Sequence, residues 1–207
     1  MRPLFAESEP SGAALVPRAT QIESRLTDQE LVIRLLDGDR WAKEALFRRY
    51  VSSVWSLAMR LVGSRADADD IVQDTFVEAL RDVTALRSLQ ALRPWLLRIA
   101  VHQAQRRFRR RNLLRRLGFG ASDDDPSLAA LMDPAASPEL CAELSRVDRA
   151  LERVSVAERF TWILRHVEGH TLEEVAVLSD CSLATAKRRL QRVNGFVLSA
   201  LGHEDAR

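Results

Sequence analysis

The sequence has few of the residues that support several large classes of protein. It has 2 cysteines in 207 residues, with no CxxC motif and no His/Cys cluster at zinc-ligand spacing, which excludes a disulfide framework and a zinc finger. No apolar run reaches the roughly 18 residues of a membrane span. The N-terminal segment carries Glu7, Glu9 and Pro10 where a signal peptide needs a continuous apolar stretch. We therefore expect a cytoplasmic protein with no metal site, no cofactor and no membrane insertion.

Motifs of catalysis are missing as well. The sequence has no Walker loop, no nucleophile motif and no paired carboxylate site. Its 4 histidines are scattered along the chain at positions 102, 166, 170 and 203. The composition is that of an ordinary globular protein, with 46% hydrophobic and 29% charged residues. We predict that the protein is not an enzyme.

The formal net charge of +2 hides a strong segregation of charge along the chain. Residues 93–116 hold nine arginines and no acid, residues 64–82 hold six acids and two arginines, and residues 117–143 hold six acids and no base. Such segregation indicates a polyanionic partner for one surface and different partners for the others. Trp95 and Ile99 are interleaved with the arginines, which favours a packed helix with a basic side over a solvated tail.

Helical periodicity and capping signals predict the elements of the first half. Residues 1–26 lack periodicity and are expected to form a flexible tail. Four helices are expected, and they begin at Thr27, at about residue 40, at Ser64 and at Pro94. Thr27 has capping-box spacing to Glu30, and Gly63 is the expected C-terminal cap of the second helix. No segment of the chain has a convincing strand pattern.

The second half begins with a segment that resists packing. Residues 117–136 are rich in glycine, proline and aspartate and are expected to form a flexible acidic linker. Residues 137–201 then read as helical, with capping-box spacing from Ser155 to Glu158 and from Thr171 to Glu174. Residues 202–207 are expected to form a short tail. The predicted fold class is all-α, with two small helical domains, 27–116 and 137–201, joined by the linker.

Residues 171–194 have the spacing of a helix-turn-helix, with a helix over 171–179, a tight turn at 180–182 and a second helix over 183–194. The planar donors of Arg188 and Gln191 suit base edges, whereas the other basic side chains suit phosphates. The candidate DNA-contacting residues are Ala184, Thr185, Lys187, Arg188, Arg189, Gln191 and Arg192. The alternative is a solvated amphipathic helix, but the absence of any acid over 183–194 favours DNA binding.

The order of these pieces resembles the extracytoplasmic-function (ECF, group IV) sigma factors of the bacterial sigma-70 family. ELVIRLLDGDRWAKEALFRRY, SRADADDIVQDTFVEAL and RPWLLRIAVHQAQRRFRRR look like the second region of that family, and VEGHTLEEVAVLSDCSLATAKRRLQRV looks like the fourth. The resemblance covers residues 28–116 and 137–201. It implies a sigma factor that binds core RNA polymerase and directs promoter-specific initiation through the minus-ten and minus-thirty-five elements.

The resemblance also implies roles for individual residues. The following would dock on the clamp coiled coil of the largest polymerase subunit: Asp69, Asp70, Ile71, Gln73, Asp74, Phe76 and Glu78. The following would bind minus-ten DNA, with the first three in the loop that captures a flipped base: Arg87, Ser88, Gln90, Arg93, Trp95, Arg98, His102, Gln103, Arg106 and Arg107. The helix over 183–192 would read the minus-thirty-five element. The polymerase flap and an anti-sigma factor would be further partners.

Two other interpretations remain open from the sequence alone. A stand-alone helix-turn-helix regulator would use its first domain to dimerise and would bind specific DNA without polymerase. The acidic face over 67–82 has no evident role in that interpretation. A small enzyme or a structural adaptor is the third interpretation, and it has no motif in its favour.

Overall fold

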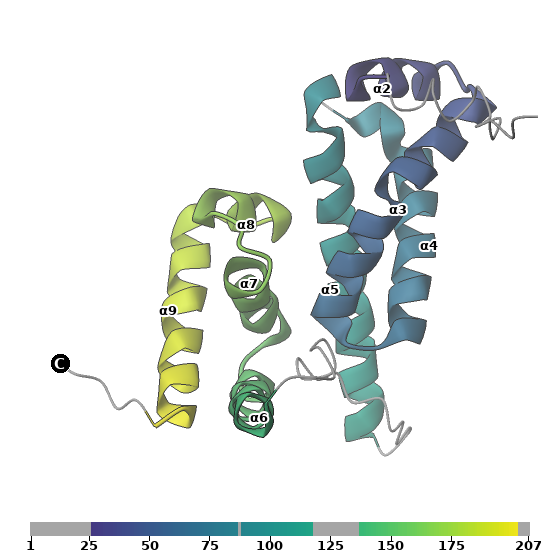
Figure 1. Cartoon of the computed structure of the whole chain (residues 1–207). Helices are drawn as coiled ribbons and strands as arrows, with labels where there is room; N and C mark the ends of the chain where they lie inside the picture. Colours follow the sequence, from purple (N-terminus) through teal and green to yellow (C-terminus); the bar gives the residue numbers. More distant parts are fainter. Residues whose placement is uncertain (1–25, 87, 118–136, 203–207) are drawn as a thin grey trace, which may run out of the picture.

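The computed structural model describes residues 26–86, 88–117 and 137–202, and all of its regular elements there are helices (Figure 1). The helices are α2 (Asp28–Leu36), α3 (Arg40–Val62), α4 (Arg65–Asp82), α5 (Leu92–Arg116), α6 (Pro138–Glu152), α7 (Val156–His166), α8 (Leu172–Leu178) and α9 (Leu183–Ala200). The predicted all-α class is confirmed. In the described ranges, no helix is long and apolar enough to cross a membrane.

Local sequence signals set most of the helix ends. The capping boxes predicted at Thr27, Ser155 and Thr171 all form, each with a hydroxyl that accepts a hydrogen bond from the backbone N–H three residues on. Ser64 caps α4 in the same way. Gly63 ends α3 with a φ of 66°, a left-handed conformation that glycine adopts without steric cost.

Two boundaries differ from the prediction. Helix α5 begins at Leu92 rather than at Pro94. Pro94 still lies in the first turn, where a backbone N–H has no partner within the helix, so its absence costs no hydrogen bond. Helix α9 continues past Asn194 to Ala200 because Val197 extends its buried stripe by one more turn. Two short 3₁₀ turns, η1 (Val83–Ala85) and η2 (Leu89–Ala91), precede α5.

Some of the predicted segments cannot be compared with the structure. The expected linker over 117–136 lies outside the described residues except for Leu117. Most of the two expected tails, 1–26 and 202–207, also lies outside them.

Helices α2–α5 pack together, and we call them the N-terminal bundle. Helices α3, α4 and α5 contact one another, and α2 lies across one end. Helices α6–α9 form the C-terminal bundle, in which α9 packs against α6, α7 and α8. Fully buried side chains of the two bundles include Leu57, Leu61, Ile71, Leu96, Leu151, Phe160, Ile163 and Leu164.

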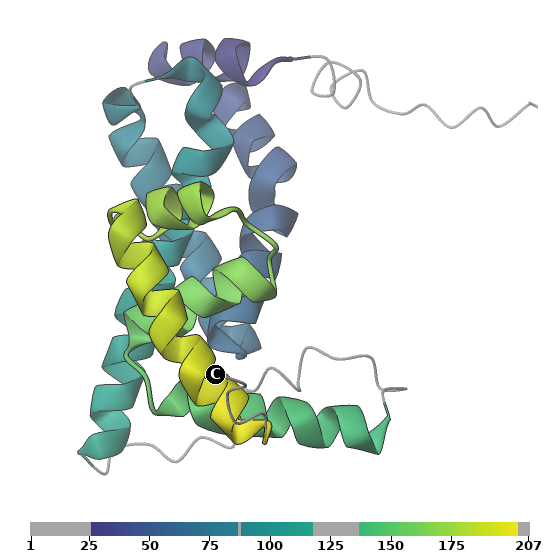
Figure 2. The ribbon, with the colours of Figure 1, turned by 90° about the vertical axis from the view of Figure 1, so that its left-hand side faces the viewer.

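The two bundles also contact each other. Helix α5 packs against α7 and α8, and α3 touches α7. The view of Figure 2, turned from that of Figure 1, has α9 in front, on the side of the C-terminal bundle away from α5. Helix α9, the second (recognition) helix of the predicted helix-turn-helix, is therefore not part of the main contact between the bundles.

Candidate polymerase and DNA interfaces

One side of α4 presents the acidic surface that the sequence led us to expect. Asp69, Asp70, Gln73 and Asp74 are exposed on it, and Glu78 is half-buried. The indole of Trp55 donates to Asp69 at 2.8 Å, which holds that carboxylate at the surface. A row of exposed acids on one helix favours binding to a basic protein surface and disfavours binding to DNA.

Two residues of the expected polymerase-binding set point the other way. Ile71 is 1% exposed and Phe76 is 5% exposed, and both belong to the core of the N-terminal bundle. Their apolar side chains follow the helical period that faces α3 and α5. This corrects the expectation: these two side chains hold α4 in place and are not available for a partner.

Two exposed apolar residues beside the acids were not singled out from the sequence. Val77 is 60% exposed on α4, one turn beyond Gln73 and Asp74. Phe47 of α3 is 44% exposed, and its ring lies against that of Phe76 with centroids 4.9 Å apart. The signal in the sequence was the interruption of the polar side of α4 by a valine. An apolar centre inside a charged rim is typical of protein interfaces.

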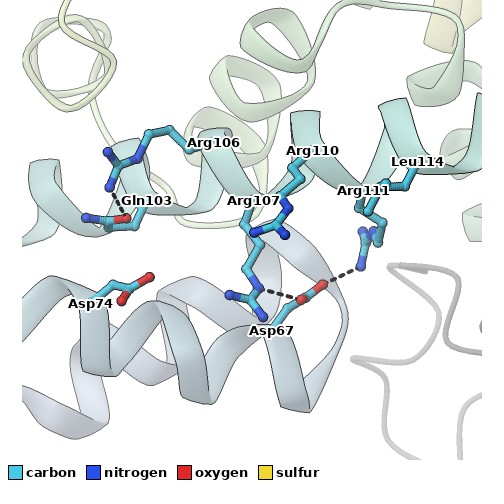
Figure 3. A pocket seen from close by; sticks show the side chains of 8 residues that line it. All are labelled: Asp67, Asp74, Gln103, Arg106, Arg107, Arg110, Arg111 and Leu114. Atoms are coloured by element: carbon cyan, nitrogen blue, oxygen red, sulfur yellow. Dashed lines mark hydrogen bonds and ion pairs between the residues drawn. The ribbon is translucent and has the colours of Figure 1, made fainter. Parts of the chain in front are cut away.

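Figure 3 shows where the acidic helix α4 meets the basic helix α5. Arg107 donates to one oxygen of Asp67 at 2.6 Å, and Arg111 donates to the other at 2.7 Å. Arg107 also pairs with Asp70. A cleft of about 460 Å³ runs along this seam, with Arg106 and Arg110 on its α5 side. The expected polymerase ligands and the expected DNA ligands therefore touch.

Gln103 is a second link between the two helices. Its side chain is 5% exposed, donates to Glu78 at 2.5 Å and accepts from Arg106 at 2.5 Å. A residue so buried cannot contact DNA directly, which corrects its place in the expected minus-ten set. Its position instead aims the guanidinium of Arg106, which is exposed.

The remaining minus-ten candidates lie along α5 and in the segment that precedes it. Ser88, Arg93 and Arg106 are exposed, whereas Arg98, His102 and Arg107 are half-buried. Trp95 is half-buried and packs against the core. Arg87 and the side chain of Gln90 lie outside the described part of the chain.

The imidazole of His102 is in a mixed electrostatic environment. Burial lowers its pKa from the ordinary value of 6.5. The carboxylates of Asp180 and Glu78 act in the opposite direction, and the guanidinium groups of Arg98 and Arg106 add to the lowering. Burial prevails, so the neutral form is favoured. Asp180 belongs to the other bundle, which places this predicted DNA ligand near the contact between bundles.

Helices α8 and α9 form the predicted helix-turn-helix. Asp180, in the turn, has a φ of 48°, a left-handed conformation that aspartate tolerates better than most residues. The Ser182 hydroxyl then caps α9 by accepting from the N–H of Thr185 at 3.2 Å. The outward face carries Ala184, Lys187, Arg188, Gln191 and Arg192, all exposed.

Two other candidates on α9 are half-buried. Thr185 lies with its hydroxyl 2.9 Å from that of Ser182. One terminal nitrogen of Arg189 is buried and has no hydrogen-bond partner among the described residues. Arg192 is exposed and lies 3.5 Å from Glu158 of α7. The unobstructed face of the recognition helix is thus centred on Lys187, Arg188 and Gln191.

Comparisons with known proteins establish the family. Residues 46–113 match the Sigma-70 region 2 family. The ECF RNA polymerase sigma-E factor of Haemophilus influenzae is 31% identical over 189 residues, covering 84% of this chain and 94% of that relative. The chain belongs to the ECF sigma factors. The sigma-E factor of Escherichia coli K12 is 34% identical over 183 residues, and the match covers 83% of this chain and 92% of that relative.

Two solved structures share the fold. CnrH in complex with the cytosolic domain of CnrY has a TM-score of 0.55 at 22% identity, covering 86% of this chain and 99% of that one. The sigma factor RpoE of Bartonella quintana, solved with the anti-sigma factor NepR, has a TM-score of 0.54 at 23% identity. The match covers 77% of this chain and 96% of the RpoE chain.

These comparisons support the function expected from the sequence and not its alternatives. This ECF sigma factor directs transcription initiation. Sigma factors bind core RNA polymerase and recognise DNA, and they are not enzymes. Neither the stand-alone regulator nor the adaptor has any support.

Proposed function

We propose that this sigma factor docks on core polymerase through the exposed side of α4. The proposed contacts are Asp69, Asp70, Gln73 and Asp74, with Val77 as an apolar neighbour, and the proposed partner surface is the basic clamp coiled coil of the largest subunit. The observation that carries the proposal is the exposure of these acids on one helix face, beside exposed apolar side chains. Complementary charge speeds the encounter, and buried apolar area stabilises the complex.

Promoter DNA is the second proposed partner. The loop around Ser88 would capture a flipped base of the minus-ten element, and Arg93, Arg98 and Arg106 of α5 would neutralise phosphates around the bubble. The outward face of α9 would enter the major groove of the minus-thirty-five element, with Arg188 and Gln191 on base edges. Both DNA-binding helices are thus proposed to act on one polymerase-bound promoter.

Further partners follow from the family. The flap of core polymerase is proposed as a second contact. An anti-sigma factor is proposed as a regulator, since RpoE of Bartonella quintana is known in complex with the anti-sigma factor NepR. The proposed compartment is the cytoplasm, where core polymerase and promoter DNA meet.

Co-elution of the purified protein with sigma-free core polymerase on a sizing column tests the polymerase contact. The wild type should co-elute stoichiometrically, and Asp70→Arg and Asp74→Arg should each reduce the bound fraction. Asp37→Arg is the matched control, because Asp37 is an exposed acid between α2 and α3. Equal binding by all four proteins would remove α4 from the interface. Absence of binding by a folded wild type would overturn the proposed function.

A further inference from the structure

We propose that α2 is the support on which the turns η1 and η2 are held for base capture, and that Asp28 is the positioning residue that fixes this support to α3. This inference rests on the proposed capture of a minus-ten base by the loop around Ser88. Asp28 acts without touching DNA, because it holds the helix against which that loop packs.

The turns η1 and η2 depend on their neighbours for their position. The N–H of Leu86 donates to the carbonyl of Val83 at 3.2 Å, and the N–H of Ala91 donates to the carbonyl of Ser88 at 3.0 Å. No side chain of the described residues caps either turn. Leu86 and Leu89 are instead partly buried against the core. Apolar packing, rather than a polar network, therefore sets where the turns lie.

Helix α2 is a neighbour of both turns and comes from a distant part of the chain. It packs against η1, η2 and α5, and it lies across one end of the N-terminal bundle (Figure 1). Its buried side consists of Leu31, Val32 and Leu35, which are at most 5% exposed. With 9 residues, α2 is too short to be a stable helix on its own. Contacts with other elements must therefore fix its place.

Two polar contacts fix the start of α2 to α3, and we call the three residues Asp28, Arg49 and Tyr50 the clasp. One carboxylate oxygen of Asp28 accepts from Arg49 at 2.9 Å, and the other accepts from the Tyr50 hydroxyl at 2.5 Å. Arg49 also donates to the carbonyl of Leu26 at 2.7 Å. Tyr50 is only 6% exposed, so its contact is better shielded from water than an ordinary surface contact. Burial and the bond to Asp28 raise the pKa of Tyr50 well above its ordinary value of 10, so the hydroxyl remains a donor.

The clasp lies near the basic start of α5, which allows an effect of position to be separated from an effect of charge. The guanidinium of Arg93 is among the groups that act on the pKa of Tyr50, and Arg93 is exposed. If Asp28 acted on DNA through its charge, removing the carboxylate would make this region more positive and would strengthen DNA binding. If Asp28 acts by position, removing it leaves fewer molecules with the turns in the binding shape, and the affinity for minus-ten DNA falls. The two effects have opposite signs.

The test uses holoenzyme that contains the full chain and two DNA probes, both selected from random sequence with the wild-type holoenzyme. One is the non-template single strand of the minus-ten element, and the other is the minus-thirty-five duplex. Asp28→Ala removes both contacts of the clasp, whereas Tyr50→Phe removes the hydroxyl and keeps the buried ring. Val62→Ala is the matched control, because Val62 is fully buried at the end of α3 that is distant from α2 (Figure 1).

The clasp variants should lose affinity for one probe only. We expect Asp28→Ala to bind the single strand about five- to tenfold more weakly than the wild type, and Tyr50→Phe about threefold more weakly, because it loses one of the two contacts. Both should bind core polymerase and the duplex as the wild type does. Val62→Ala should lower the free energy of unfolding and leave all three affinities unchanged. A general loss of stability would not produce this division.

Hydrogen exchange of the Leu86 and Ala91 amides in the same proteins measures the order of the turns. Both amides should exchange faster in Asp28→Ala and in Tyr50→Phe than in Val62→Ala. Unchanged exchange in the clasp variants would overturn the inference, because the clasp would then not hold the turns. Unchanged or tighter single-strand binding by these variants would overturn it, as would an equal weakening in Val62→Ala. A wild-type holoenzyme that selects no promoter DNA would instead overturn the proposed function, which is a different result.

Discussion

Arg107 donates to Asp67 at 2.6 Å, and the same carboxylate accepts from Arg111, so Asp67 joins the acidic helix α4 to two arginines of the basic helix α5. The segregated charges seen in the sequence are thus partly neutralised inside the N-terminal bundle. Arg106 and Arg110 remain exposed along the seam. The basic character that the helix offers to DNA is therefore smaller than its nine arginines imply and is concentrated on the exposed ones.

The role of Asp67 can be measured by removing its charge. Asp67→Asn keeps the shape of the side chain but removes the charged partner that two partly buried guanidinium groups share, although Arg107 keeps its pair with Asp70. We expect the free energy of unfolding to fall by about 1.5–3 kcal/mol, the range for hydrogen bonds to charged groups. Urea denaturation measures this loss. Asp74→Asn is the control, since Asp74 is exposed and its change should stay within about 0.5 kcal/mol. Equal stability of the two variants would contradict a structural role for Asp67.

Gln103 should act on DNA only through Arg106. Gln103→Leu removes the acceptor that aims the guanidinium of Arg106 and should weaken binding of the holoenzyme to minus-ten DNA. Arg106→Gln should weaken it too, and the double variant should be no weaker than Arg106→Gln alone, because the two changes remove one interaction. Titration of labelled minus-ten DNA with holoenzymes that contain the wild type, each single variant or the double variant measures the four affinities of this double-mutant cycle. Additive losses would mean that Gln103 contributes to binding independently.

Local signals were enough to predict the helices, but not the side chains that face a partner. Each capping box lies within four consecutive residues, which is why all three were predicted correctly. Ile71 and Phe76 were placed at the polymerase surface by resemblance, although their helical spacing belongs to the buried stripe. Family resemblance locates a helix in an interface, and periodicity decides which of its sides is free.

The contact between bundles had no signal in the sequence at all. Arg60 and Glu168 are separated by 108 positions, and Phe108 and Phe160 by the whole linker. Nothing in the local pattern of either residue identifies its partner. The end of α9 was missed for a related reason, because burial of Val197 depends on how α9 packs against its neighbours rather than on a stop signal.

Stability should depend on pH through the imidazoles of His102 and His166, which the fold partly shields from water. Burial lowers the pKa of His102 and of His166 below 6.5 in the folded protein, so the unfolded chain binds these protons more readily. Their contribution to stability is complete above pH 6.5 and is lost as the pH falls through the folded pKa values. We expect the free energy of unfolding to decrease between about pH 7 and about pH 5.5, and to decrease less in His102→Gln. Urea denaturation across this interval measures both slopes, and parallel slopes would show that His102 is not responsible.

Arg188 and Lys187 should differ in what they contribute to promoter binding. Arg188 is exposed on α9 and has a planar fork that fits the two acceptors of a guanine, so Arg188→Ala should relax selection at one minus-thirty-five position by about 1–3 kcal/mol. Lys187→Ala should weaken binding to all sequences alike and lower the salt dependence by about one phosphate contact. Competition among single-base variants of the selected duplex, repeated at two salt concentrations, separates the two effects. A uniform loss in Arg188→Ala would place that side chain on the backbone, and the base-reading role would then fall to Gln191, the next exposed planar donor on the same face of α9.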